Sequence, residues 1–122
     1  MNTRKILIVD DETRIVEILD KFLSKEGFNV EKAYDGDEAL EIVKKDSSID
    51  LIVLDEKMPY MNGTVMCEEM EKLNIKIPVI LLTGSLSMLK DKDFKRISYE
   101  NVAIKPIRLS DLKKLIDRIL GE

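Results

Sequence analysis

The sequence predicts an α/β protein in which five parallel strands form one doubly wound sheet with helices on both faces. Three runs of continuous aliphatic residues, Ile6–Val9, Leu51–Leu54 and Val79–Leu82, are typical of strands that are buried on both sides. Stretches with the spacing of amphipathic helices alternate with these runs. Five such strand–helix units account for the 122 residues, and right-handed crossovers between parallel strands give the doubly wound arrangement.

The first unit is the strand Ile6–Val9 followed by a helix that begins near Glu12. The apolar residues of this helix follow the spacing of one buried face: Ile15, Ile18, Leu19, Phe22 and Leu23. Gly27 can supply the left-handed residue that commonly ends a helix. Residues 28–34 predict a weaker, edge-like strand, and the turn that follows offers Asp35 as a cap for the second helix.

The middle of the chain contains the most hydrophobic strand. Leu51–Leu54 is fully apolar and ends on Asp55, and a loop with proline and glycine follows over residues 58–63. Residues 64–73 predict a third helix. Within it, Cys67 is expected to fill space in the core rather than to react.

The last two units are shorter. After the strand Val79–Leu82, residues 86–97 predict a helix, although a run of charged residues interrupts its apolar pattern. Val102–Ile104 predicts a short fifth strand. Ser110 is expected to cap a final helix that ends before Gly121. The buried stripe of that helix is Leu112, Leu115, Ile116 and Ile119.

Composition excludes several classes of function. The net charge of −4 argues against a direct nucleic-acid binder. One cysteine cannot form an internal disulfide, and the absence of histidine excludes serine–histidine catalysis and histidine-bound metals. No signal peptide or membrane-spanning run is present, so we expect a cytoplasmic protein. Without a linker, residues 1–122 are expected to form one domain with no second domain in this chain.

Polar residues follow the strands, and parallel strands place such residues at one edge of the sheet, where these folds bind ligands. They are Asp10, Asp11, Asp55, Thr83, Ser85 and Lys105, and the neighbouring Gly84 and Pro106 lie at the same strand ends. Two carboxylates about 5 Å apart repel by roughly 3 kcal/mol at an effective dielectric constant of ~20. Three carboxylates therefore call for a positive partner, and Mg²⁺ suits an all-oxygen site. The alternative is that Asp10 and Asp11 only cap the first helix.

The remaining residues at this edge suit a phosphoryl group. Asp55 can act as a nucleophile or a metal ligand, although an aspartate that only forms a turn is the alternative. Lys105 can pair with phosphate oxygens, or it can simply neutralise the acidic cluster. Thr83 can donate a hydrogen bond, and Gly84 allows close approach of its backbone. The bond between Lys105 and Pro106 can be cis.

Together these segments resemble the receiver domain of response regulators in bacterial two-component signalling. The segments are Ile6 to Asp11, Leu51 to Asp55 with Met58, Pro59 and Gly63, Thr83 with Gly84, and Lys105 with Pro106. One segment alone is a weak signal, but all of them in this order, each at a strand end, form a specific one. The resemblance covers essentially the whole chain and implies a flavodoxin-like (βα)5 domain.

The resemblance implies a phosphorylation site with its own metal. Asp55 would be the phosphoacceptor and would receive the group from a phosphohistidine of a sensor kinase or a phosphotransfer protein. Asp10, Asp11 and Asp55 would bind Mg²⁺ together with the backbone carbonyl of Lys57.

The resemblance also assigns the residues that hold the phosphoryl oxygens, which are Thr83, Gly84, Lys105 and Lys57. Lys57 either covers the phosphoryl group or pairs with an acidic side chain at rest. The family commonly has an aromatic residue where this chain has Val102, so we expect activation to be relayed by the backbone. The output surface would be the face of the fourth helix, fifth strand and fifth helix.

Three functions follow as hypotheses. The first is the phosphoacceptor, which would act as a monomer or a phosphorylation-dependent dimer, bind a downstream partner or its own output domain, and have no separate enzyme activity or membrane contact. The second is a receiver-like interaction module that switches without phosphate. The third is a phosphatase with an aspartyl nucleophile, which is disfavoured because such enzymes commonly have a second aspartate at the position of Lys57.

Overall fold

The five strands form the single parallel sheet that the sequence predicts, and their order in the sheet is β2-β1-β3-β4-β5. The computed structural model describes residues 3–97 and 99–121. The strands are β1 (Lys5–Val9), β2 (Asn29–Ala33), β3 (Leu51–Asp55), β4 (Val79–Thr83) and β5 (Val102–Ile104). Successive strands are added on one side of β1 for β2 and on the other side for β3, β4 and β5. Doubly wound folds bind ligands at such a switch point, which here lies between β1 and β3.

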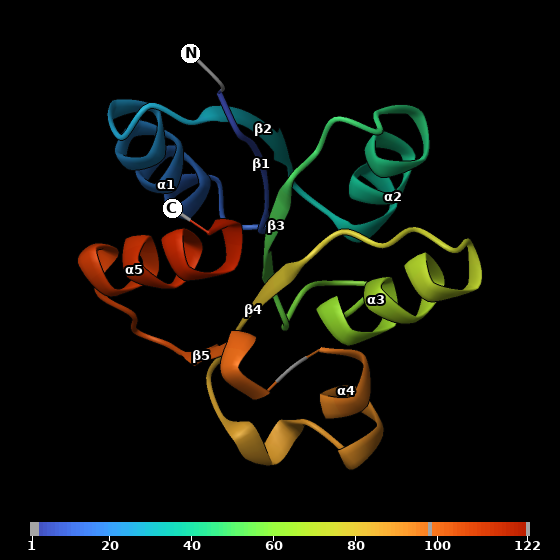
Figure 1. Ribbon diagram of the computed structural model, residues 1–122. Helices are drawn as coiled ribbons and strands as arrows, with labels where there is room; N and C mark the ends of the chain where they lie inside the picture. The colour runs from blue at the N-terminus through green and yellow to red at the C-terminus, as the bar shows by residue number, and fades with distance from the viewer. Residues whose placement is uncertain (1–2, 98, 122) are drawn as a thin grey trace.

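The helices cover the sheet in two layers (Figure 1). They are α1 (Thr13–Lys25), α2 (Gly36–Lys45), α3 (Gly63–Lys72), α4 (Asp91–Arg96) and α5 (Leu109–Leu120), with the 3₁₀ turns η1 (Leu86–Met88) and η2 (Tyr99–Asn101). One layer consists of α1 and α5, and the other consists of α2, α3 and α4. None of the helices in the described ranges is long and apolar enough to cross a membrane.

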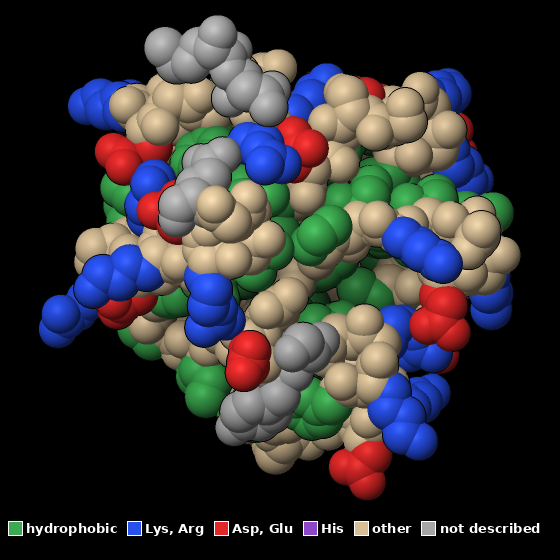
Figure 2. Space-filling model, in the orientation of Figure 1, with side chains coloured by type: hydrophobic (Ala, Val, Ile, Leu, Met, Phe, Trp, Pro, Cys, Tyr) green, Lys and Arg blue, Asp and Glu red, His purple; other side chains and the backbone are tan. Residues whose placement is uncertain are grey.

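Alternate residues of the central strands belong to two hydrophobic cores. In β1, Ile6 and Ile8 pack under α1 and α5, whereas Leu7 and Val9 pack under α2 and α3. All four side chains are buried, which is why these runs are continuously apolar rather than alternating with polar residues. On the surface, charged side chains of both signs lie around the periphery, and hydrophobic side chains gather towards the centre of the face shown (Figure 2).

The predicted helix ends are confirmed at three positions. Asp35 is the N-cap of α2, and its carboxylate accepts a hydrogen bond from the backbone N–H of Glu38 at 2.7 Å. Gly27 and Gly121 follow α1 and α5 with φ values of 94° and 75°. These left-handed conformations cost glycine little and are used to end helices.

Two predicted boundaries are wrong. Residues 86–97 do not form one helix, because Ser85 caps the separate turn η1 and a new helix starts after Lys90. Asp93 favours this second start by accepting the Lys90 backbone N–H at 2.8 Å. Ser110 does not cap α5, because the backbone carbonyl of Arg108 already accepts the N–H of Leu112 at 3.0 Å.

One glycine determines how closely α3 approaches the end of β3. A Cβ atom on Gly63 would lie 2.7 Å from the backbone oxygen of Asp55 and 2.8 Å from Leu81 Cδ1. Real Cβ contacts are not this short, so any side chain here would push α3 away from the sheet.

We expect Gly63→Ala to lower the free energy of unfolding by about 1–3 kcal/mol, which is typical of overpacking. Chemical denaturation checks this value. Gly84→Ala is the matched control, since a Cβ on Gly84 meets nothing within 4 Å, and its stability should be close to that of the wild type. Equal stability of the two variants would contradict the packing argument.

Candidate functional site

The predicted polar residues meet at the carboxyl end of the sheet. Asp55 closes β3 opposite Leu82 of β4, and Thr83 closes β4 opposite Ile104 of β5. Asp10 follows β1, and its backbone N–H bonds to the carbonyl of Ala33 at 3.2 Å. The structure thus brings neighbouring strand ends together, as parallel pairing requires.

Three carboxylates share a small volume at this edge. Asp10, Asp11 and Asp55 each offer an oxygen, and these oxygens all lie within 4.8 Å of one another. Asp10 and Asp55 are only 1% and 3% exposed, whereas Asp11 is exposed. Lys105 supplies positive charge, with its Nζ atom 2.5 Å from Asp55 Oδ1. The peptide bond that follows, between Lys105 and Pro106, is cis.

Burial and crowding shift the pKa values of this group. Burial raises the pKa of Asp10 to about 6, and the nearby Asp55 carboxylate adds to the shift. Burial also raises the pKa of Asp55, and the opposing ion pair with Lys105 does not cancel the effect. Burial works against the charge on Lys105, but the carboxylates around it outweigh this and raise its pKa. The positive charge of Lys105 therefore does not offset the burial of the Asp10 and Asp55 carboxylates.

The donor set fits a hard cation. Asp10 Oδ1 accepts the backbone N–H of Glu12 at 2.9 Å, but the buried Oδ2 atom has no hydrogen bond among the described residues. Asp55 Oδ1 is also buried and has only the ion pair with Lys105. The carbonyl of Lys57 accepts no hydrogen bond from a described residue. Carboxylate and carbonyl oxygens left free in this way are the ligands that Mg²⁺ prefers.

Among the residues expected to hold phosphate, Thr83 ends β4, the strand that pairs with β3. The hydroxyl of Thr83 donates to the Ser85 carbonyl at 3.0 Å and accepts the Ser85 N–H at 3.3 Å. Gly84 is exposed between them. Lys57 is also exposed, and none of the ion pairs among residues 3–97 and 99–121 involves it.

Comparison with known proteins assigns the family. Residues 6–117 match the response regulator receiver domain family. This chain belongs to that family. The resemblance noted from the strand-end motifs is thereby confirmed, and the chain is a receiver domain of two-component response regulators.

Relatives of this receiver support the assignment in sequence and in structure. It is 38% identical to the probable transcriptional regulator ycf27 of Cyanidium caldarium over 94% of this chain and 45% of the relative. The Francisella response regulator 1452 receiver domain has a TM-score of 0.87 at 28% identity and covers 98% of both chains. TrrA of Thermotoga maritima, solved in complex with Mg(2+)-BeF, has a TM-score of 0.84 at 29% identity over 96% of this chain and 99% of TrrA.

The curated relatives are longer proteins. This receiver spans 45% of the ycf27 regulator of Cyanidium caldarium, 49% of that of Porphyridium aerugineum and 37% of the regulatory protein PhoP of Bacillus subtilis.

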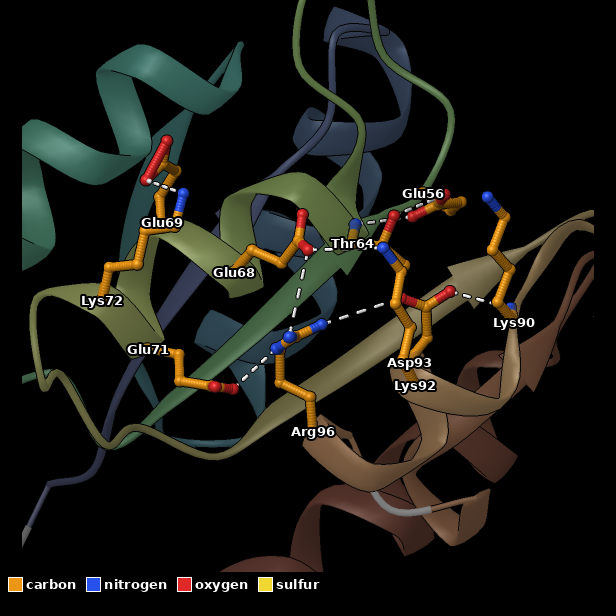
Figure 3. A network of polar contacts seen from close by, with 10 residues as sticks. All are labelled: Glu56, Thr64, Glu68, Glu69, Glu71, Lys72, Lys90, Lys92, Asp93 and Arg96. Atoms are coloured by element: carbon orange, nitrogen blue, oxygen red, sulfur yellow. Dashed lines mark hydrogen bonds and ion pairs between the residues drawn. The ribbon is translucent and has the colours of Figure 1, made fainter.

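One site residue of the receiver gives no signal in the sequence. Glu56 follows Asp55 and is 4% exposed. Its carboxylate accepts the backbone N–H of Thr64 at 2.7 Å and the Thr64 hydroxyl at 3.1 Å (Figure 3). Its carbonyl also accepts the N–H of Gly63 at 2.9 Å. Glu56 therefore holds the start of α3 against the end of β3, a role that depends on a contact eight residues away.

Charged residues join α4 of the receiver to α3. Arg96 lies 2.6 Å from Glu71 and 3.9 Å from Glu68, both on α3, and 3.8 Å from Asp93 on its own helix (Figure 3). Lys92 is 3.6 Å from Glu68. Phe94 and Ile97 also pack against the core beneath α2 and α3, so apolar contacts and ion pairs together hold this segment.

Two further predictions concern single side chains. Cys67 is buried, as expected for a residue that fills the core, and burial raises the pKa of its thiol to about 12. Its thiol is therefore poorly suited to reaction. Val102, where the family commonly has an aromatic residue, is partly buried against the core beneath α2 and α3. Tyr99, the aromatic residue three positions before Val102, has its side chain outside the described residues.

The raised pKa of Asp10 predicts a stability difference that depends on pH. A carboxyl with a pKa of about 6 in the folded protein and an ordinary pKa of 3.8 binds more protons in the folded state, so its contribution to stability is lost as pH rises through this interval. In metal-free buffer, Asp10→Asn should be more stable than the wild type at about pH 7.5, by on the order of 2 kcal/mol. The advantage should shrink at about pH 5. Urea denaturation at both pH values checks this, and a difference that does not vary with pH would contradict it.

Proposed function

We propose that this receiver accepts a phosphoryl group on Asp55 from a phosphohistidine of a sensor kinase or a phosphotransfer protein. The observation that carries the proposal is the placement of the Asp55 carboxylate. It is buried at the end of β3, within 4.8 Å of the carboxylates of Asp10 and Asp11, and paired with Lys105 at 2.5 Å. One nucleophile is thus surrounded by groups that can hold a cation and an anion.

The chemical step needs little from the protein apart from placement and charge. An oxygen of Asp55 attacks the phosphorus in line, the P–N bond of the phosphohistidine breaks, and its electron pair returns to the histidine ring. The product is an aspartyl phosphate. Lys105, the backbone N–H of Gly84 and the hydroxyl of Thr83 would hold the phosphoryl oxygens.

The acidic residues of the site would hold Mg²⁺. Asp10, Asp11, Asp55 and the backbone carbonyl of Lys57 are the proposed ligands, with Asp11 as the more direct of the first pair and Asp10 acting through water. When bound, Mg²⁺ neutralises the charge that gathers on the phosphoryl oxygens. The relative TrrA, which was solved with Mg(2+)-BeF, supports this part of the proposal.

Thr83 would transmit the phosphorylation of Asp55 to the rest of the domain. Its hydroxyl can reach a phosphoryl oxygen only by giving up its present bonds to Ser85. Ser85 caps η1, which leads into α4. A shift there would move the face formed by α4, β5 and α5, where we place the binding of a downstream partner, an output domain or a second copy. With Val102 in place of an aromatic residue, the backbone would carry this change.

Lys57 would act on the phosphorylated form. Since it is exposed and has no ion pair in the described part of the chain, we favour the interpretation in which its ammonium group lies over the phosphoryl group. The whole domain, residues 1–122, would work in the cytoplasm as a signalling switch that promotes its own phosphorylation and dephosphorylation. It would have no separate substrate.

Incubation with Mg²⁺ and acetyl phosphate tests the proposal, with intact mass as the readout. Wild type should gain one phosphate, and Asp55→Asn should gain none because its amide is not a nucleophile. Asp37→Asn, on the surface of α2, is the matched control and should be phosphorylated like the wild type.

An undiminished adduct in Asp55→Asn would contradict the assignment of the acceptor. No adduct on the wild type, together with partner binding that is unchanged in Asp55→Asn, would support the interaction module that switches without phosphate.

A further inference from the structure

The loop between β3 and α3 is closed at the proposed phosphorylation site. It leaves the sheet at Asp55 and returns at Gly63, whose backbone N–H bonds to the carbonyl of Glu56 at 2.9 Å. A Cβ on Gly63 would lie 2.7 Å from the Asp55 backbone oxygen. The residues between these two ends therefore form a short projection beside Asp55.

Tyr60 lies within this projection and has an unfavourable backbone conformation. Its φ is 68°, and the N–H of Met61 bonds to the carbonyl of Pro59 at 2.8 Å. A hydrogen bond across a single residue with positive φ is a γ-turn of the rare, strained kind. Such a conformation is unusual for a bulky aromatic residue, and strain of this sort is concentrated at functional sites.

The methionines near Tyr60 anchor the turn on both sides. Met58 is buried in the core beneath α2 and α3. Met61 packs against the start of α2, where a Cβ on Gly36 would lie 2.7 Å from its Sδ atom. The loop is thus held down before and after Tyr60, and the turn between these anchors determines where the Tyr60 ring points.

The Tyr60 side chain does nothing for the fold of the described residues. It is 103% exposed, and its hydroxyl has no hydrogen bond with any of them. The exposed ring makes no contact among the described residues that would offset the strain of the turn that holds it. Tyrosine is, however, among the residue types that contribute most to protein–protein interfaces.

We infer that Tyr60 is a docking residue for the protein that carries the phosphohistidine. The inference rests on the proposed function and goes beyond it by naming a contact for the donor. Asp55 is 3% exposed and is reached from the edge of the sheet that the loops form. A protein whose histidine approaches Asp55 must cover these loops, including the projection that bears Tyr60. A small phosphodonor reaches Asp55 without touching it.

The test compares a protein donor with a small donor on the same variants. The protein donor is the autophosphorylated catalytic core of a histidine kinase that phosphorylates the wild type, and the small donor is acetyl phosphate. Tyr60→Gly removes the ring in a residue that tolerates positive φ, and Tyr60→Phe keeps the ring. Leu73→Ala is the matched control, because Leu73 is 47% exposed at the C-terminal end of α3, at the opposite edge of the sheet.

We expect Tyr60→Gly to lower the second-order rate of transfer from the kinase about tenfold. Its phosphorylation by acetyl phosphate should be unchanged, which shows that the site itself is intact. Tyr60→Phe and Leu73→Ala should transfer like the wild type. An unchanged kinase rate in Tyr60→Gly would overturn the inference, and so would an equal loss with both donors. Absence of wild-type phosphorylation by acetyl phosphate would instead count against the proposed function.

Discussion

Electrostatic repulsion among three carboxylates is the constraint on which the rest of this receiver depends. Parallel strands deliver Asp10, Asp11 and Asp55 to one edge, where their oxygens lie within 4.8 Å of one another. Lys105 pairs with only one of them, and the pKa values of Asp10 and Asp55 rise as a result of burial and crowding. The apolar strands that stabilise the fold therefore hold together an edge that is unfavourable without a further cation.

The surroundings of Asp55 connect this edge to two separate parts of the domain. On one side, Glu56 holds the start of α3, and charged residues join α3 to α4. On the other side, Thr83 bonds to Ser85, which caps the turn that leads to α4. Both routes reach α4, a helix of six residues that is attached to α3 through ion pairs. Under the proposed function, a change of charge at Asp55 would reach α4 by these two routes, although Phe94 and Ile97 also pack this segment against the core.

The sheet and the position of the site were predictable from the sequence, but several local contacts were not. Buried parallel strands give runs such as Leu51–Leu54, and the direction of such strands determines where Asp55 and Thr83 must lie. The break near Leu89 was missed because residues of both η1 and α4 pack on one core, and only local contacts such as the bond from the Lys90 N–H to Asp93 separate the two elements.

Other features depend on contacts that spacing does not reveal. From the sequence, Glu56 looks like an ordinary surface residue, because its bond to Thr64 forms only when the start of α3 lies beside the end of β3. The positive φ of Tyr60 follows from the anchoring of its neighbours. The bonds between Thr83 and Ser85 join residues only two positions apart, and the residue types alone do not specify them.

The most direct measurement of the central claim is the melting temperature of the wild type and Asp55→Asn, each in EDTA and in Mg²⁺. We expect Mg²⁺ to raise the melting temperature of the wild type, and we expect Asp55→Asn to melt higher than the wild type in EDTA, since it carries one charge fewer. A wild type insensitive to Mg²⁺, with a variant that melts lower in EDTA, would contradict the claim that repulsion among the carboxylates constrains this edge.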